Sequence, residues 1–187
     1  GVTPGRYAAP VVQQDVPVTL ASVLGVSMPP TATGRVLPGV RRSSAPPRAV
    51  LFTVLDGMRV DYFDRYASDM PVLTALRNKS AWFSNARVNY LPTNTGAGHA
   101  TLATGALPRL HGITGNNLYD HIAKKRYDTL SGWSPRDLLA LTLADVWQLA
   151  TRGRAKVVAQ GSSVPASVAL AGHGACQING TKTLHAG

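Results

Sequence analysis

Two stretches of the chain are strongly apolar and rich in β-branched residues. The first, Ala49–Leu55, reads AVLFTVL, and the second, Ala155–Gly161, reads AKVVAQG. Short apolar runs of this kind are typical of strands that are buried on both faces of a parallel sheet. The pattern therefore predicts two buried strands, with helical segments between them.

Helical periodicity appears before and after the first of these runs. Leu20, Val23 and Leu24 fall on one helical face, between Asp15, a candidate N-cap, and a stop at Gly25. Further along, one short helix is predicted after a cap at Asp61 and another where Pro71 occupies a first turn.

The longest predicted helix spans residues 134–153. Ser134 and Asp137 have the spacing of a capping box, with an aspartate in place of the usual Glu or Gln. Its apolar positions repeat at helical spacing, and Gly153 is the predicted stop. These positions are Leu139, Leu143, Val146 and Leu149.

Strands and helices that alternate with short connections predict an α/β fold. Residues 41–48, RRSSAPPR, have the composition of a linker, because they are charged, small and broken by prolines. We therefore expect a segment 1–40, a linker 41–48 and a main unit 49–187.

The chain carries 19 Lys and Arg against 9 acidic residues, a net charge of +10. The basic residues are scattered and lack the interleaved aromatic residues that bind single strands. We expect no nucleic-acid partner, and we keep a basic protein that binds nucleic acid only as a third alternative for the function. No apolar run approaches the length of a membrane span. The single cysteine, Cys176, excludes an internal disulfide.

Candidate chemistry lies where the first predicted strand ends and where a helix rich in small residues begins. Asp56 follows the strand, and ligands of α/β sheets bind at the carboxyl ends of strands. Thr95 precedes Gly96-Ala97-Gly98, a helix start whose open N–H groups favour an anion. The alternatives are that Asp56 belongs to a turn and that Thr93 or Thr95 merely caps the helix.

Three longer motifs add specificity: VLDGMRVDYF, PTNTGAGHATLATGALPRLHGITGNNLYD and TLADVWQLATRGRAKVVAQ. Together they make the chain, from Arg48 to Gly174, resemble the alkaline phosphatase superfamily, nearest to its type I phosphodiesterase/nucleotide pyrophosphatase branch. The resemblance implies a sandwich with a mostly parallel central sheet flanked by helices, incomplete in this chain. It also implies that Thr95 is the nucleophile, that Asn116 binds a phosphoryl oxygen, and that Asp56 and Thr95 are metal ligands.

The implied reaction is the hydrolysis of a small-molecule phosphoester, and diesters and nucleotide pyrophosphates are the favoured substrates. It proceeds through a phospho-threonine and uses two divalent metal ions, zinc by the resemblance, about 4 Å apart. Members of the superfamily mostly work outside the cytoplasm, which implies a periplasmic or secreted protein.

The sequence departs from the family pattern in its metal ligands. The family adds an Asp-x-x-x-His motif, an Asp-His pair and a further histidine, all later in the chain. Asp120-His121 is the one Asp-His pair here, and we interpret it as coincidental because of its position. We expect His99 to pack locally, and His173 and His185 match no ligand position.

The order of segments is also unusual, because residues 1–40 resemble the end of the family domain rather than its beginning. A junction of tandem domains, a permuted chain and a fragment are the three explanations, and we favour a fragment of something longer. A fragment without most zinc ligands would be inactive, which is one alternative to the enzymatic function.

The second alternative, an alkaline phosphomonoesterase, is weakened at two positions. Phosphomonoesterases of the family carry a Lys-x-Arg pair where this chain has Ser163 and Pro165.

Gly174–Thr183 is similar to a P-loop motif, but its spacing differs from that motif by one residue. We therefore expect no nucleotide-binding loop there.

Overall fold

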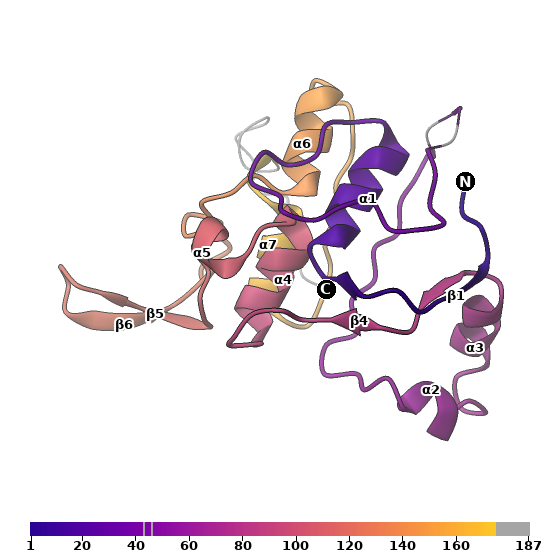
Figure 1. The fold of residues 1–187 in the computed structure, drawn as a ribbon. Helices are drawn as coiled ribbons and strands as arrows, with labels where there is room; N and C mark the ends of the chain where they lie inside the picture. Colours follow the sequence, from indigo (N-terminus) through magenta and orange to yellow (C-terminus); the bar gives the residue numbers. More distant parts are fainter. Residues whose placement is uncertain (43, 46, 175–187) are drawn as a thin grey trace.

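Small side chains bring two helices together at the centre of the fold. The structure is a computed structural model, and it describes residues 1–174 except 43 and 46. Helix α4 (Thr95–Thr104) packs against α7 (Val164–Ala171), as Figure 1 shows. Buried alanines on both helices allow this close approach. The core cluster around them comprises Ala100, Ile113, Leu130, Leu138, Val168 and Ala169.

Helices α1 (Asp15–Leu24) and α6 (Leu143–Ala150) complete the helical part of the fold, and α1 contacts both α4 and α6. Helix α1 confirms the predicted helix, and it ends at Gly25, whose φ of 71° suits a residue without a side chain. Asp15 does not cap it as predicted. Its carboxylate accepts hydrogen bonds from the backbone N–H of Val12 at 2.9 Å and of Arg35 at 2.8 Å.

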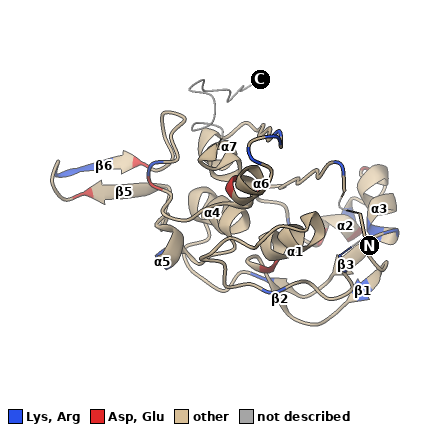
Figure 2. Ribbon diagram, turned by 90° about the horizontal axis from the view of Figure 1, so that it is seen from above, with Lys and Arg blue, Asp and Glu red and all other residues tan. Residues whose placement is uncertain are grey.

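The strands are short and form three separate pairs. Two pairs are parallel and join the N-terminal segment to the middle of the chain: β1 (Gly5–Tyr7) with β3 (Ala81–Phe83), and β2 (Val11–Val12) with β4 (Ala86–Arg87). The third pair is an antiparallel hairpin, β5 (Asn117–Asp120) with β6 (Lys125–Asp128), which projects from the helices in both Figure 1 and Figure 2.

Three further helices are short. Helices α2 (Tyr62–Arg65) and α3 (Pro71–Asn78) confirm the predicted helices, and α5 (Pro108–His111) follows α4. Asp61 precedes α2, but its carboxylate pairs with Arg59 and Arg65 rather than capping the helix.

The two buried strands predicted at 49–55 and 155–161 are not formed. Both segments are extended, but no backbone hydrogen bond pairs them with a strand in the described part of the chain. Every second side chain faces outward, so that Leu51 is 92% exposed and Val158 is 87% exposed. The inward side chains line a cavity of about 610 Å³ against the helices. A strand needs a neighbouring strand to satisfy its backbone, and neither segment has one among the residues that the structure describes.

The long helix predicted over 134–153 is also wrong, because only α6 forms within it. Asp137 accepts hydrogen bonds from the backbone N–H of Leu130 and the Tyr127 hydroxyl instead of closing a capping box. The box is made by Thr142 and Asp145, where both reciprocal hydrogen bonds are present. Tertiary contacts thus outweigh the helical periodicity before residue 142.

Helices and short parallel strand pairs together make a mixed fold that is compatible with the α/β class. The predicted division at 41–48 stays a prediction, although the segment before it packs against α4 and α6 through α1. Within the described residues, we find no helix that is both long and apolar enough for a bilayer crossing.

Candidate functional site

Thr95 is the first residue of α4, and the residue before it caps the helix. The Asn94 side chain accepts a hydrogen bond from the backbone N–H of Ala97 at 3.3 Å. The alternative that Thr93 or Thr95 provides the cap is therefore wrong. Because Asn94 has that function, the Thr95 hydroxyl is available for another partner.

The partner of the Thr95 hydroxyl is Asp56. Thr95 Oγ1 donates a hydrogen bond to Asp56 Oδ2 at 3.1 Å, across 39 residues of sequence. Asp56 lies at the end of the extended segment 49–55, where the sequence places it. The structure thus brings together the two residues that the sequence analysis selects as nucleophile and metal ligand.

Asn116 contacts the same helix start. Its Oδ1 accepts a hydrogen bond from the backbone N–H of Gly96 at 2.8 Å. A Cβ at Gly96 would come within 3.1 Å of the Gly115 carbonyl oxygen, so the glycine permits this close approach. In the described part of the chain, no hydrogen bond involves Asn116 Nδ2, which leaves an amide donor next to Thr95.

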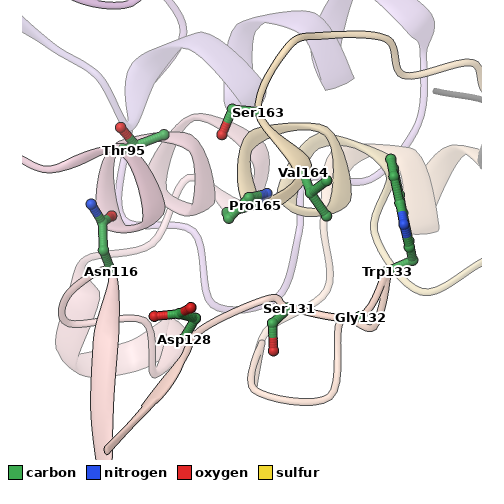
Figure 3. A pocket seen from close by; sticks show the side chains of 9 residues that line it. All are labelled: Thr95, Asn116, Asp128, Ser131, Gly132, Trp133, Ser163, Val164 and Pro165. Atoms are coloured by element: carbon green, nitrogen blue, oxygen red, sulfur yellow. The ribbon is translucent and has the colours of Figure 1, made fainter. Parts of the chain in front are cut away.

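Thr95 and Asn116 line one pocket of about 420 Å³, shown in Figure 3. The other walls come from the end of β6, the loop after it and the start of α7. Of the described residues that line the pocket, none is Lys or Arg, and the carboxylate of Asp128 is the one charge. They are Thr95, Asn116, Asp128, Ser131, Gly132, Trp133, Ser163, Val164 and Pro165.

The loop after β6 has an unusual backbone. Leu130, Gly132 and Trp133 have φ values of 56°, 60° and 58°, in the left-handed region that only glycine adopts at little cost. Leu130 is fully buried in the core cluster and Trp133 packs against it. Such conformations cost about 1–3 kcal/mol each and persist where packing enforces them. The core thus holds this wall of the pocket in a defined shape.

A metal ion would find only part of a site in the described residues. No group of three or more His, Cys or Asp side chains is positioned to hold a metal in the parts of the chain that the structure describes. Asp56 and Thr95 offer two adjacent oxygen donors, which suit one divalent ion. These two residues therefore fit one half of the predicted metal centre.

The histidines that the structure describes add no ligand at this place. His99 is buried and its Nδ1 contacts the Thr95 carbonyl oxygen at 2.9 Å, which agrees with local packing. The Asp120-His121 pair lies at the hairpin turn, where Asp120 accepts the backbone N–H groups of Ile122 and Ala123. His185 and Cys176 lie outside the described residues.

His173 belongs to a separate cluster at the start of α6. Its Nδ1 contacts Asp145 Oδ2 at 2.9 Å and its Nε2 contacts the Leu138 carbonyl oxygen at 3.0 Å. The hydrogen bond to Asp145 raises the pKa of His173 above its usual value, although burial opposes it. Burial acts to raise the pKa of Asp145, but bonds from His173 and Thr142 outweigh it and hold that pKa low. This pair stabilises α6 and lies outside the Thr95 pocket.

His111 lies between α4 and the chain segment that leads to Asn116. It is fully buried, and burial lowers its pKa to about 4. Its Nδ1 accepts a hydrogen bond from the backbone N–H of Ile113, and its Nε2 contacts Thr101 Oγ1 at 3.0 Å. The neutral ring therefore links α4 to the chain that leads to Asn116.

Two residues of the site were missed by the sequence analysis. Asn94 could have been found from its type and its place three residues before Ala97, which is the spacing of an N-cap. Asp128 could have been found from the hairpin, because NLYD and KRYD are alternating arms around a turn. That hairpin pairs Asn117 with Asp128 and returns the chain to the pocket.

Comparison with known proteins agrees with this geometry. The family described as type I phosphodiesterase/nucleotide pyrophosphatase matches residues 50–177. Alkaline phosphatase PafA of Elizabethkingia meningoseptica is 34% identical over 154 residues, which cover 72% of this chain and 28% of that protein. Alkaline phosphatase PhoV of Synechococcus elongatus is 30% identical over 145 residues, covering 69% of this chain and 26% of that protein.

A shorter similarity extends to animals. Ectonucleotide pyrophosphatase/phosphodiesterase family member 1 of Mus musculus is 38% identical over 74 residues, 40% of this chain and 8% of that protein. No solved structure matches the chain. The chain spans little more than a quarter of the length of the two alkaline phosphatases. Because the family match covers most of the chain and includes Asp56, Thr95 and Asn116, this protein belongs to the type I phosphodiesterase/nucleotide pyrophosphatase family, within the alkaline phosphatase superfamily.

Proposed function

We propose that this chain carries the nucleophile half of a phosphoester hydrolase site. The observation that carries the proposal is the Thr95 hydroxyl, hydrogen-bonded to Asp56 at the mouth of a pocket that also contains the Asn116 amide. A hydroxyl can act as the nucleophile of a covalent phosphoryl transfer, and an amide donor can stabilise the charge on a phosphoryl oxygen.

Thr95 Oγ1 attacks phosphorus and forms the phospho-threonine, while the bond to the departing alcohol oxygen breaks. Asp56 Oδ2 accepts the hydrogen bond of the attacking hydroxyl and takes its proton, while the departing alkoxide takes a proton from water. Asn116 Nδ2 donates to a non-bridging oxygen, where negative charge accumulates. Water then cleaves the phospho-threonine, releasing the phosphate product and restoring the hydroxyl.

Divalent metal ions, zinc by the family resemblance, would lower the pKa of the hydroxyl and neutralise the phosphoryl charge. Asp56 and Thr95 would hold one of them, and ligands for the second would come from outside the described residues. The same proposal includes an alkaline-phosphatase-like sandwich with a mostly parallel central sheet flanked by helices. It also includes a periplasmic or secreted location.

The pocket favours diesters over monoesters in this proposal. Ser163 and Pro165 line it where monoesterases of the family have cations, so a doubly charged phosphate would lack compensation. Alkaline phosphomonoesterase is the second candidate, because two relatives that cover most of the chain are alkaline phosphatases.

The test is zinc uptake by calorimetry, with hydrolysis of bis(p-nitrophenyl) phosphate and p-nitrophenyl phosphate measured in the same samples. Wild type is compared with Asp56→Ala, with Thr95→Ala and with Asp69→Ala, a matched acid outside the pocket. We expect zinc uptake that Asp56→Ala weakens and Asp69→Ala leaves intact. Diester turnover depends on ligands for the second metal ion and, where these are present, Thr95→Ala should abolish it. Turnover that survives Thr95→Ala would contradict the assigned nucleophile.

A further inference from the structure

The β5–β6 hairpin ends in a turn that leaves an isoleucine in solvent. Ile122 lies at the tip, and its side chain is 96% exposed. Figure 1 and Figure 2 both show the hairpin projecting away from the helices, so the tip lies far from the core. Single apolar residues are ordinary on a protein surface, and the surroundings of Ile122 therefore decide whether it has a role.

The turn that carries Ile122 has a defined shape. Asp120 Oδ1 accepts hydrogen bonds from the backbone N–H groups of Ile122 and Ala123, at 2.8 and 2.9 Å. Lys124 closes the turn with a φ of 53°, and the strands on either side pair along their whole length. Because these backbone contacts order the turn, the exposed position of Ile122 is built into the hairpin.

Three consecutive cations follow the tip. Lys124, Lys125 and Arg126 are all exposed, and none of them forms an ion pair in the described part of the chain. The hairpin has two carboxylates: Asp120, which orders the turn, and Asp128, at the opposite end of β6. Figure 2 shows the cations at the outer end of the hairpin. Even with Asp120 counted, this end has an excess of positive charge.

An aromatic side chain belongs to the same outer end. Tyr119 is 46% exposed and pairs with Arg126 across the hairpin. Its ring packs edge-on against the ring of His121, with the centroids 5.0 Å apart. Tyrosine is enriched where an apolar phase meets water, because its ring is apolar and its hydroxyl stays hydrated. The outer end thus combines an apolar tip, an interfacial aromatic ring and unpaired cations.

We propose that the outer end of the β5–β6 hairpin docks the protein on the surface of an anionic phospholipid membrane. Ile122 enters the boundary between headgroups and acyl chains, while Lys124, Lys125 and Arg126 attract the lipid phosphates. A polyanion such as nucleic acid would also attract the cations, but it offers no apolar phase for the isoleucine. The inference is independent of catalysis, since the tip and the pocket residue Asp128 lie at opposite ends of the hairpin.

Co-sedimentation with vesicles tests the contribution of charge. We expect the protein to bind phosphatidylcholine vesicles that contain phosphatidylglycerol, and to bind much more weakly to vesicles of phosphatidylcholine alone. Each cation near an anionic surface contributes about fivefold to the partition coefficient, so Lys125→Gln combined with Arg126→Gln should lower it about 25-fold.

A second double variant controls for net charge. Arg6 in β1 and Lys79 directly after α3 are exposed and form no ion pair in the described part of the chain. Figure 1 and Figure 2 show β1 and α3 on the side of the molecule opposite the hairpin. Arg6→Gln combined with Lys79→Gln removes the same charge beyond the range of salt screening, and should change the partition coefficient little.

Ile122→Ser tests the apolar tip, and it leaves the backbone hydrogen bonds of the turn in place. We expect it to weaken binding to anionic vesicles by about tenfold, and to leave retention on double-stranded DNA unchanged. Vesicle binding that is indifferent to Ile122→Ser, with DNA retention that the hairpin double variant abolishes, would identify a site for polyanions and overturn the membrane proposal. Equal losses in the two charge variants, or no binding of the wild type to anionic vesicles, would also overturn it.

Discussion

Because of His111, we expect the free energy of unfolding to fall as the solution is made acidic. The ring is fully buried, and burial lowers its pKa to about 4 from an ordinary value of 6.5. Its contacts with Ile113 and Thr101 suit the neutral ring, which accepts at Nδ1. The unfolded chain, by contrast, binds a proton at the ordinary value. Between these two pH values the unfolded state therefore binds more protons, and stability falls as the pH falls.

The magnitude follows from the two pKa values. Each pH unit between 6.5 and about 4 corresponds to about 1.4 kcal/mol, so His111 contributes about 3 kcal/mol above pH 6.5 that is lost near pH 4. A domain of this size has a free energy of unfolding of about 5–15 kcal/mol. Acidification through this window should therefore remove a considerable part of the total stability.

Urea denaturation, followed by tryptophan fluorescence at several pH values between about 7 and 4, measures this loss. The His111→Gln variant, which cannot take up a proton, should be less stable near neutral pH but should show a flatter pH dependence. The informative quantity is the difference between the two curves. If wild type and variant lost stability in parallel between these pH values, the buried neutral imidazole would not be the cause.

Three further predictions concern stability. Asp145→Asn should lower the free energy of unfolding by about 3 kcal/mol, because it leaves His173 without its anionic partner. It should also abolish the part of the stability that wild type loses as pH rises through the raised pKa of His173, as denaturation near neutral and alkaline pH would reveal. Gly34→Ala should cost about 2 kcal/mol or more in thermal unfolding, because its Cβ would collide with a backbone carbonyl at the start of α1; an unchanged melting temperature would refute this. Asn94→Ala should cost about 1 kcal/mol through loss of the α4 cap, whereas Thr93→Ala should be nearly neutral, and the reverse order in urea denaturation would restore the threonine cap.

Local sequence patterns predicted the elements whose stability is mainly local. Helix α4 has small residues, a polar residue at its cap and a glycine at its end, and it forms from Thr95 to Thr104. Helix α3 begins at its predicted proline. The proximity of Asp56 to Thr95 could also be anticipated, because the family resemblance makes both residues part of one site.

Elements that depend on distant partners could not be predicted in the same way. The apolar runs 49–55 and 155–161 have strand composition, but a strand exists only when another strand satisfies its backbone. The periodicity of 134–153 is real, yet Asp137 binds the loop before it and Leu139 donates its N–H to the His111 carbonyl oxygen. The first outcome was decided by the lack of a partner strand among the described residues, and the second by contacts that the local pattern does not contain.

The exposed sides of segments 49–55 and 155–161 have a consequence for the behaviour of the protein in solution. Neither segment pairs with a strand in the described part of the chain, and such a backbone with outward Leu51 and Val158 is a template for pairing between molecules. The net charge of +10 opposes such encounters by mutual repulsion, and salt screens this repulsion. Concentrated samples of the chain should therefore self-associate more readily as ionic strength rises, so colloidal stability will limit the conditions under which its chemistry can be measured.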